Sequence, residues 1–353
     1  MKIGAAGILG VNPAACALAS GLAAEGVQVR LLDEFKDNLR LALARAAWTL
    51  EKAGKRSSIS NIEPVQEAKK MSGADIVLET GTLADEGRLS LLSAVSEAAG
   101  ENCVIGLSAR SRVEPTANSL SSPERCVGVN FHACPAGGWL SEIIRPALAS
   151  AEAVELCSDS LKRAGLSVIF ASDCEGAVVQ RLRLAYIFSA VQLLESGKGF
   201  PRELDEAVRT LCGSAVGPLE LADSLGLDNL SPASAPPSIA KLSKYGQLGK
   251  KTGLGFYIYD DGSAAGENPA LSDMVRCLGI SAASRETVFL SVMRAVVAQA
   301  QALVNGAAAS EYDVETAAKL ALGWKKGPFG WKRELGEKLS VSAPSPDAWG
   351  DAL

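Results

Sequence analysis

Small apolar residues, a turn and an alternating segment follow one another at the start of the chain, and this order predicts a strand–helix–strand unit. Asn12 and Pro13 favour a helix start, and residues 14–25 have helical apolar spacing. Gly26 suits the helix end, and residues 27–33 alternate like a strand before an acidic end. The apolar start also resembles a secretory signal, but Pro13 and the alternating segment favour a folded unit.

Apolar strands and helical stretches continue to alternate through the first half of the chain. The predicted strands are residues 74–79, 103–107, 126–131 and 167–170, and the predicted helices include residues 38–52 and 91–99. Strands alternating with helices predict a largely parallel sheet that is covered on both faces, which is the doubly wound α/β class. We therefore expect one α/β domain over residues 1–174.

Beyond residue 174 long helical patterns dominate, and one set of landmarks occurs twice. A helical stretch at 181–197 corresponds to 285–306, a helix start at 203–208 to 312–317, a Gly-Pro start at 216–219 to 326–329, and a helix end at 224–226 to 334–336. Matched landmarks in the same order predict an internal duplication in an all-α region. The expected copies are residues 175–262 and 283–353, joined by a linker at 263–282 that begins rich in Gly, Ser and Ala.

Composition narrows the function classes. The 353 residues exceed one usual core, and 48% of them are hydrophobic, so two or three globular domains are expected. A net charge of -5 without a long basic stripe argues against nucleic acid. Eight scattered cysteines and a single histidine exclude an ordinary zinc cluster and favour a cytoplasmic protein without a metal. Beyond the N-terminal segment we expect no stretch long and apolar enough to span a membrane.

The turn between the first strand and helix is the first candidate for chemistry. Counting back from Asp33 places Gly10, Asn12 and Ala15 at the three glycine positions of a G-x-G-x-x-G dinucleotide motif. The helix that follows would direct its positive end at a diphosphate. The Asp33 carboxylate suits ribose hydroxyls and repels a 2′-phosphate, so the sequence predicts NAD as the cofactor. The alternative is a strand-end aspartate in a fold that keeps only the topology.

Further landmarks are spread over nearly the whole chain. They are residues 31–33 (LLD), 74–79 (ADIVLE), 123–128 (PERCVG), 216–223 (VGPLELAD) and 248–257 (LGKKTGLGFY). Together they resemble the 3-hydroxyacyl-CoA dehydrogenases, and the duplicated tail is similar to that of longer bacterial members and of multifunctional fatty-acid oxidation proteins. The resemblance implies a Rossmann-type NAD-binding domain, an acyl thioester substrate, and NAD-dependent interconversion of 3-hydroxyacyl and 3-oxoacyl thioesters.

The resemblance also implies a histidine that takes the hydroxyl proton and a glutamate that orients this histidine. The family's His-Phe-Phe-Asn-Pro run aligns with residues 130–134, which read NFHAC. Asn130 therefore stands at the position of the base, and an amide has no useful basicity. His132 lies two residues further along an extended chain, on the same side and roughly 6 to 7 Å away. Glu142 keeps the orienting position, and His132 is either a displaced base or a half-buried histidine without chemistry.

Two other polar positions of the family differ in this chain. The family's asparagine in a Val-Asn-Arg-Leu run is Gln180 here. Its Ser-Asn-Thr-Ser-Ser segment is also altered, so Ser108 or Ser111 is the expected partner of the substrate hydroxyl. Arg110 and Arg112 add charge nearby, either for an anionic substrate group or facing water.

Three functions stay open from the sequence. The first is the NAD-dependent 3-hydroxyacyl-CoA dehydrogenase, and the second is a catalytically impaired homologue that binds nucleotide or acyl-CoA without turnover. The third is a dehydrogenase of a free hydroxy acid. Lys52, Lys55 and Arg56 either meet coenzyme A phosphates or form a solvated helix end. The duplicated helical copy can replace a partner's domain, so the protein is expected to be a monomer or a homodimer.

Overall fold

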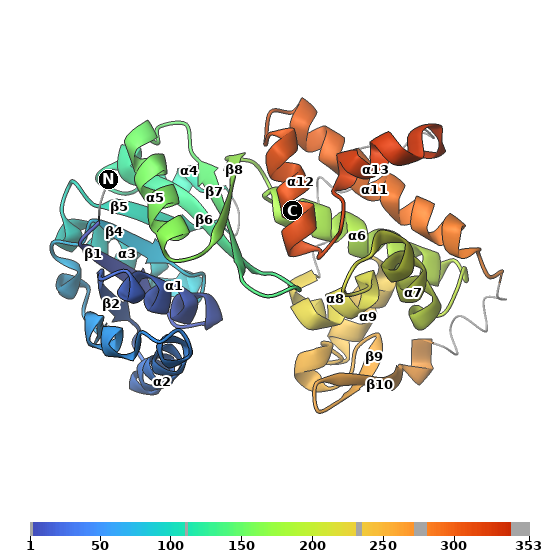
Figure 1. Ribbon diagram of the computed structural model, residues 1–353, viewed down its shortest axis with the longest axis horizontal. Coiled ribbons are helices and arrows are strands. Elements are labelled where there is room, and N and C mark those ends of the chain that lie inside the picture. Colours follow the sequence, from blue (N-terminus) through green and yellow to red (C-terminus); the bar gives the residue numbers. More distant parts are fainter. Residues whose placement is uncertain (1–2, 110–111, 231–234, 272–280, 340–353) are drawn as a thin grey trace. The chain divides into compact units, whose positions relative to one another are not determined.

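The computed structural model describes residues 3–109, 112–230, 235–271 and 281–339 (Figure 1). The chain divides into two compact units, residues 1–177 and 178–353. The first unit ends close to the boundary predicted at residue 174. Both helical copies lie within the second unit, whereas the sequence analysis treated them as separate domains.

The first unit is built on an eight-stranded sheet, as the alternation of strands and helices predicts. Its strands are β1 (Ala5–Leu9), β2 (Gln28–Leu32), β3 (Ile62–Val65), β4 (Ile76–Glu79), β5 (Val104–Ser108), β6 (Cys126–Ala133), β7 (Trp139–Arg145) and β8 (Ser167–Ser172). The strand order is β3-β2-β1-β4-β5-β6-β7-β8. Strands β1 to β6 pair in parallel, and the β6–β7 hairpin is antiparallel. Because β7 and β8 run parallel to each other, the sheet is mixed at one edge only.

Helices cover both faces of this sheet. They are α1 (Pro13–Ala24), α2 (Lys36–Lys52), α3 (Asp85–Ala99), α4 (Glu114–Asn118) and α5 (Ala151–Arg163). In Figure 1, α1 and α5 lie on one face of the sheet. Apolar residues of α1, α2 and α5 join alternate strand residues such as Ile8, Leu78 and Val129 in one buried core. This doubly wound arrangement confirms the predicted fold class.

Two strands escaped prediction because their patterns are polar. β3 exposes two consecutive residues, Glu63 and Pro64, so it does not alternate. β7 contains Ser141 and Glu142, and both are fully buried. Buried polar residues in a strand contradict the apolar pattern from which strands are predicted, and they are expected at functional positions.

The second unit consists mainly of two copies of one helical motif. The first copy has α6 (Val178–Glu195), α7 (Pro201–Cys212), α8 (Pro218–Leu225) and α9 (Pro237–Lys244), and the second has α11 (Arg285–Asn305), α12 (Glu311–Ala321) and α13 (Pro328–Leu335). The helices α8 and α13 differ by 110 positions at both bounds, and α7 and α12 begin 110 positions apart. This constant shift of 110 positions supports the predicted duplication. It makes Glu315 the counterpart of Asp205, whereas the sequence alignment of 203–208 with 312–317 is shifted by one residue.

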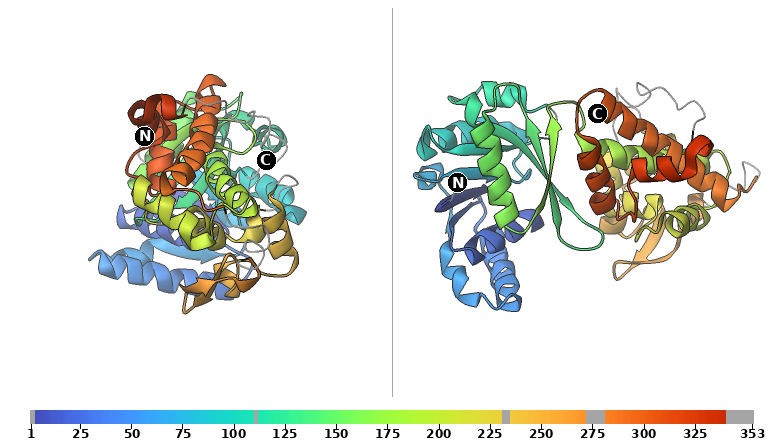
Figure 2. Two further views of the ribbon diagram at one scale, coloured as in Figure 1. Left: turned by 90° about the vertical axis from the view of Figure 1, so that its right-hand side faces the viewer. Right: turned by 45° about the horizontal axis from the view of Figure 1, so that its top comes forward.

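The two copies pack against each other. Figure 2 shows α11 alongside α6, and α11 also contacts α7. The rings of Tyr186 and Trp324, one from each copy, meet edge to face with centroids 5.3 Å apart. Ser214 Oγ donates a hydrogen bond to the carbonyl oxygen of Leu322 at 3.1 Å. The copies therefore share one core.

The segment predicted as a linker at 263–282 begins as a strand instead. β9 (Tyr257–Asp260) and β10 (Ser263–Glu267) form an antiparallel pair. Asp261 and Gly262 connect them with φ angles of 45° and 72°, which suits a two-residue hairpin turn. The Asp-Gly turn sets this pairing, and the Gly/Ser/Ala composition concealed it. Residues 272–280 lie outside the described part of the chain.

One expectation about membranes needs correction. The helix α11 is long and apolar enough to cross a membrane by length and composition, with 56% of its apolar window buried inside the structure. The sequence analysis expected no such stretch. Its apolar residues are core residues that pack on α6 and α7.

Candidate functional site

The turn between β1 and α1 requires a glycine. Gly10 has φ +83°, a conformation that L side chains rarely adopt. A Cβ at this position would lie 1.8 Å from Thr82 Oγ1, so the side chain of Thr82 occupies the space over the glycine. Thr80 Oγ1 shares its hydrogen between the carbonyl oxygens of Leu9 and Gly10. The predicted first glycine is therefore held closely by the segment that follows β4.

Asn12 caps α1 and also bridges to the next loop. Its Oδ1 accepts a hydrogen bond from the Ala15 amide at 2.8 Å, which is the N-cap interaction. Its Nδ2 donates to the carbonyl oxygen of Thr80 at 2.8 Å. Both ends of the side chain are engaged, so the Asn12 side chain is fixed between α1 and the β4–α3 loop. Pro13 lacks an N–H, and the Ala15 amide is occupied, so this helix end offers fewer donors than a glycine-rich one.

Asp33 follows β2 and is nearly buried, with 8% exposure. One carboxylate oxygen accepts from the Val11 amide at 3.0 Å. The other accepts from the Phe35 amide and from Asn38 Nδ2, each at 3.0 Å. A carboxylate has about four lone-pair sites, so the positioned group keeps acceptor capacity for a ribose hydroxyl.

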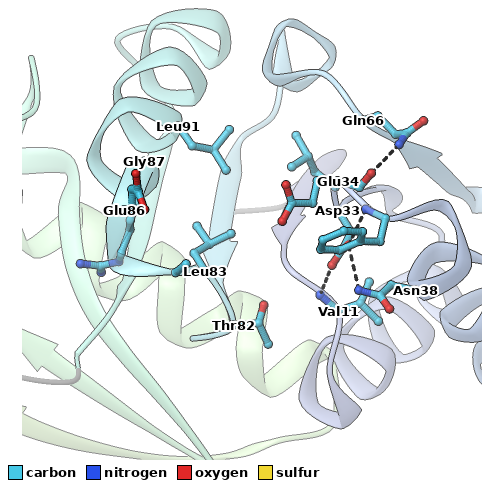
Figure 3. Close-up of a pocket in the computed structure, with 14 residues that line it drawn as sticks. Val11, Asp33, Glu34, Asn38, Gln66, Thr82, Leu83, Glu86, Gly87 and Leu91 are labelled. Carbon is cyan, nitrogen blue, oxygen red and sulfur yellow. Dashed lines mark hydrogen bonds between the residues drawn. The ribbon is translucent and has the colours of Figure 1, made fainter.

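A cavity of about 560 Å³ lies beside Asp33. Figure 3 shows Val11, Asp33 and Asn38 on one side, with Thr82 and Leu83 on the other. Of the residues assigned to the cofactor, Asp33 lines the cavity, while Gly10 and Asn12 lie in the neighbouring β1–α1 turn and Ala15 in the first turn of α1. The position beyond the carboxyl ends of β1 and β4 is where doubly wound sheets bind nucleotides.

The β6–β7 hairpin brings together the histidine and glutamate that the sequence analysis selected. His132 Nε2 lies 3.4 Å from Glu142 Oε2. The glutamate side chain is fully buried and the histidine side chain is 11% exposed. The strand register pairs Asn130 with Glu142 and His132 with Leu140, so the imidazole reaches the carboxylate diagonally. The contact exists, and its catalytic role stays a prediction.

Asn130 has a structural partner of its own. Its Oδ1 accepts a hydrogen bond from the Ala109 amide at 3.2 Å, which links β6 to the end of β5. Its carbonyl oxygen accepts from Ser141 Oγ at 3.3 Å. Asn130 therefore links the backbone of β6 to the end of β5 and to β7.

The remaining predicted residues fall in three places. Ser108 ends β5, one strand away from Asn130, and its hydroxyl lies over Gly81, where a Cβ would come within 2.9 Å of it. Gln180 is half-buried on α6 in the second unit, and its approach to the first unit stays a prediction. Ser111 and Arg110 lie outside the described residues. Arg112 pairs with Glu114 at 3.3 Å and is half exposed, which favours the water-facing alternative.

The cations considered for coenzyme A phosphates are already engaged. Lys55 Nζ donates to Glu25 at 3.1 Å and to the Ala24 carbonyl oxygen. Arg56 pairs with Glu51. Lys52 Nζ lies 3.8 Å from the centroid of the Trp48 ring. These contacts are those of a solvated helix end.

Sequence reasoning missed the pair formed by Glu79 and Arg88. Glu79 ends β4 with a fully buried side chain, and Arg88 binds both of its carboxylate oxygens. Hydrogen bonding to this carboxylate raises the pKa of Arg88 above its ordinary value. The signal available in the sequence was a charged residue closing an otherwise apolar strand, at 76–79.

No cluster of three or more histidine, cysteine, aspartate or glutamate side chains that could hold a metal occurs among the described residues.

A doubly wound sheet with an acidic residue after its second strand and a buried histidine–glutamate pair is the architecture of a nucleotide-dependent dehydrogenase domain. A family model described as the NAD binding domain of 3-hydroxyacyl-CoA dehydrogenase matches residues 3–174. The model of the C-terminal domain of the same enzyme matches residues 176–259. The chain belongs to the 3-hydroxyacyl-CoA dehydrogenase family, and NAD-dependent oxidoreductase chemistry is the activity that the family supports.

Individual relatives agree with this assignment. The chain is 26% identical over 282 residues to the mitochondrial hydroxyacyl-coenzyme A dehydrogenase of Homo sapiens, covering 71% of this chain and 90% of that protein. It is 27% identical over 345 residues to the fatty acid oxidation complex subunit alpha of Shewanella amazonensis, covering 89% of this chain and 48% of that protein. The crystal structure of 3-hydroxybutyryl-CoA dehydrogenase from Escherichia coli matches with a TM-score of 0.81 at 19% identity, covering 96% and 93% of the two chains. This last match shows that a solved structure has the same fold over nearly the whole chain, both helical copies included.

Proposed function

We propose that the protein interconverts 3-hydroxyacyl and 3-oxoacyl thioesters of coenzyme A with NAD, and that His132 is the acid–base group. The observation that carries the proposal is the 3.4 Å contact between His132 and the fully buried Glu142. A buried carboxylate beside an imidazole stabilises the imidazolium that forms when the base takes a proton. The name of the human relative, hydroxyacyl-coenzyme A dehydrogenase, supports a coenzyme A thioester as the substrate.

The proton pathway follows from the orientation of the ring. Nε2 lies 3.4 Å from Glu142 Oε2, and in the proposed tautomer it carries the hydrogen toward this carboxylate. In that tautomer Nδ1 takes the hydroxyl proton in oxidation and returns it in reduction. Asn130 cannot take this role, because an amide has no useful basicity, and its side-chain oxygen Oδ1 already accepts a hydrogen bond from the Ala109 amide. The base has moved two residues along β6 and kept the same glutamate.

The residues present fit NAD. In the proposal Asp33 holds the adenosine ribose from the cavity wall, and the β1–α1 turn with Gly10 and Asn12 faces the diphosphate. Asp33 and the neighbouring Glu34 both line the cavity, and their charges disfavour a 2′-phosphate. When bound, NAD accepts hydride from the hydroxyl-bearing carbon.

The decisive test is His132→Gln, assayed with acetoacetyl-CoA and NADH by the loss of NADH absorbance. We expect kcat/KM to fall by about 10²- to 10⁴-fold, the contribution usual for a general acid–base group. The NADH dissociation constant, measured by fluorescence titration, should stay unchanged because Asp33 and the β1–α1 turn are intact. An unchanged turnover rate in this variant rejects His132 as the base.

The same measurements separate the second candidate, a homologue that binds without turnover. The observation that favours this candidate is that Asn130 stands at the family's histidine position and that the Asn130 side chain accepts a hydrogen bond from the Ala109 amide. NADH binding by the parent protein without turnover of any 3-oxoacyl-CoA favours this candidate, and turnover by the parent excludes it.

A further inference from the structure

A buried ion pair that the proposed mechanism does not use lies at the end of β4. The Glu79 side chain is fully buried, and the Arg88 side chain is 17% exposed. Arg88 Nε donates to one carboxylate oxygen at 2.7 Å and Nη2 to the other at 2.8 Å, which is a bidentate arrangement. Desolvation of two buried charges offsets much of their attraction, so such a pair supplies a defined position more than stability.

The pair holds the last residue of β5 by its backbone. The Ser108 amide donates to Glu79 Oε2 at 2.9 Å. The Ser108 carbonyl oxygen accepts from Arg88 Nη2 at 3.0 Å. Both polar groups of one peptide residue are thus bound by the two members of one ion pair, and this fixes the end of β5 relative to β4.

Hydrogen bonds continue from this residue toward the histidine. The next amide, of Ala109, donates to Asn130 Oδ1 at 3.2 Å. Asn130 is the register partner of Glu142, whose Oε2 lies 3.4 Å from His132 Nε2. The ion pair, the end of β5 and the histidine–glutamate pair are therefore linked through adjacent strands.

Arg88 is also part of the cavity beside Asp33. A break in α3 precedes it, because Gly87 has φ +80° inside the helix. Thr82, Leu83 and Arg88 all line the 560 Å³ cavity. Because Arg88 binds Glu79 at the end of β4, the ion pair attaches this side of the cavity to the sheet. Arg88 faces a second cavity of about 280 Å³ as well, next to Pro115 and Thr116.

We propose that Glu79 and Arg88 form a clamp that positions Ser108 and Asn130 for turnover, with Arg88 acting through Glu79 and the Ser108 peptide and not as a contact of the nucleotide. This inference rests on the proposed function. Lysine keeps a positive charge beside the Glu79 carboxylate but has a single ammonium group in place of the planar guanidinium. Arg88→Lys therefore keeps the charge balance of the pair and removes the group that binds Glu79 and the Ser108 carbonyl oxygen together.

The test combines amide exchange with kinetics. In Arg88→Lys, hydrogen–deuterium exchange at Ser108 and Ala109 should become at least about tenfold faster while the Val104 and Ile105 amides stay protected, which marks a local opening. The kcat for acetoacetyl-CoA reduction should fall by about 10- to 100-fold, as expected for a displaced active-site segment, with an unchanged NADH dissociation constant. Arg333→Lys is the matched control, since Arg333 pairs with Glu311 at 2.9 Å on the exposed surface of the second unit.

Each outcome decides the inference. Unchanged exchange in Arg88→Lys overturns the clamp, and faster exchange with unchanged kcat overturns its role in turnover. A weaker NADH dissociation constant with unchanged exchange identifies a direct nucleotide contact and also overturns it. If Arg88→Lys does not fold, the double variant Glu79→Gln/Arg88→Gln, which removes both charges, is measured in the same way. A parent protein without turnover defeats the proposed function, whereas the exchange result alone still confirms or rejects the clamp.

Discussion

Single residues of the β6–β7 hairpin show how two positions of one strand can both lie near the same carboxylate. Asn130 lies directly opposite Glu142, and His132 lies opposite Leu140. The imidazole nevertheless reaches Glu142, because residues two apart on a strand face the same side and diagonal neighbours are within reach of an aromatic ring. The carboxylate can therefore serve a base at either position.

This geometry predicts the outcome of a double exchange. His132→Phe removes the base and should lower kcat/KM for acetoacetyl-CoA by about 10²- to 10⁴-fold. Asn130→His added to His132→Phe restores a histidine opposite Glu142 and should recover at least part of the loss. The recovery is measured with acetoacetyl-CoA and NADH in matched assays.

The single variant Asn130→His is the control for the exchange. This variant retains His132 and loses the hydrogen bond from the Ala109 amide. Its kcat/KM therefore shows how much activity is lost with that hydrogen bond alone, separately from the effect of moving the base. A double variant that is no more active than His132→Phe contradicts a glutamate able to serve both positions.

At the scale of elements, the start of α1 is held by more than its cap. Asn12 caps the helix through the Ala15 amide and reaches the carbonyl oxygen of Thr80 beyond β4. Ser150 caps α5 through the Ala153 amide alone. The two helices thus share a capping interaction and differ in the additional bridge.

The comparison of these caps gives a second prediction. Ser150→Ala should lower the free energy of unfolding by about 1 kcal/mol, the usual value of an N-cap. Asn12→Ala should cost about 1 kcal/mol more, because the Thr80 carbonyl oxygen also loses its donor. Urea unfolding measures both, and only Asn12→Ala should alter the NADH dissociation constant. Equal costs for the two variants contradict the bridging role.

Buried aspartates organise the first helical copy. Asp205 accepts hydrogen bonds from the Leu219 and Glu220 amides and from the Tyr257 hydroxyl. Burial raises the pKa of Asp205 to about 7 from its ordinary 3.8, against the lowering effect of these donors. Burial likewise raises the pKa of Asp223 to about 6.

The raised pKa of Asp205 sets the sign of a pH dependence. Between about pH 4 and pH 7 the folded protein keeps a proton on Asp205 that the unfolded chain has lost, so stability falls as the pH rises through this window. The slope reaches at most about 1.4 kcal/mol per pH unit for one proton. Asp205→Asn should remove this component, so urea unfolding across the window should show a flatter profile for the variant than for the parent.

An exposed aspartate provides the opposite control. Hydrogen bonding to Lys251 lowers the pKa of Asp228, whose contribution is present above its ordinary pKa and disappears as the pH falls. Asp228→Asn should therefore leave the decline between pH 4 and pH 7 in place. An Asp205→Asn profile that keeps the full slope contradicts a protonated Asp205 in the folded protein.

At the scale of the whole molecule, duplication decides how the helical surface is covered. The second copy packs on α6 and α7 of the first through contacts such as Tyr186 with Trp324. A chain with one copy would leave this face of α6 for a partner. We expect the intact protein to be a monomer in solution because its own second copy fills that position.

Light scattering coupled to size-exclusion chromatography tests this expectation. The measured mass should equal that of one chain over a wide range of protein concentrations. A constant mass of two chains would show that the shared core of the copies leaves another face for association.

Much of the fold could be predicted from local patterns. The strand–helix–strand start, the cap at Asn12 with Pro13 after it, and the repeated Gly-Pro helix starts depend on short-range backbone preferences, so the sequence carried them directly. β3 and β7 could not be found in this way, because a strand with polar residues is stabilised by its neighbours in the sheet. The Asp-Gly hairpin after β9 was readable in principle and was concealed by composition.

By itself, the sequence determined the α/β class, the duplication, and the positions of Asp33 and of the single histidine, His132, since each follows from residue type and spacing. Tertiary structure alone decided that His132 reaches Glu142. It also decided that the side chains of Asn12 and Asn130 hydrogen-bond to backbone groups, and that Glu79 and Arg88 both bind the backbone of Ser108. The physical reason is that these contacts join separate strands and loops, so their geometry depends on sheet register and on which buried polar group finds a partner.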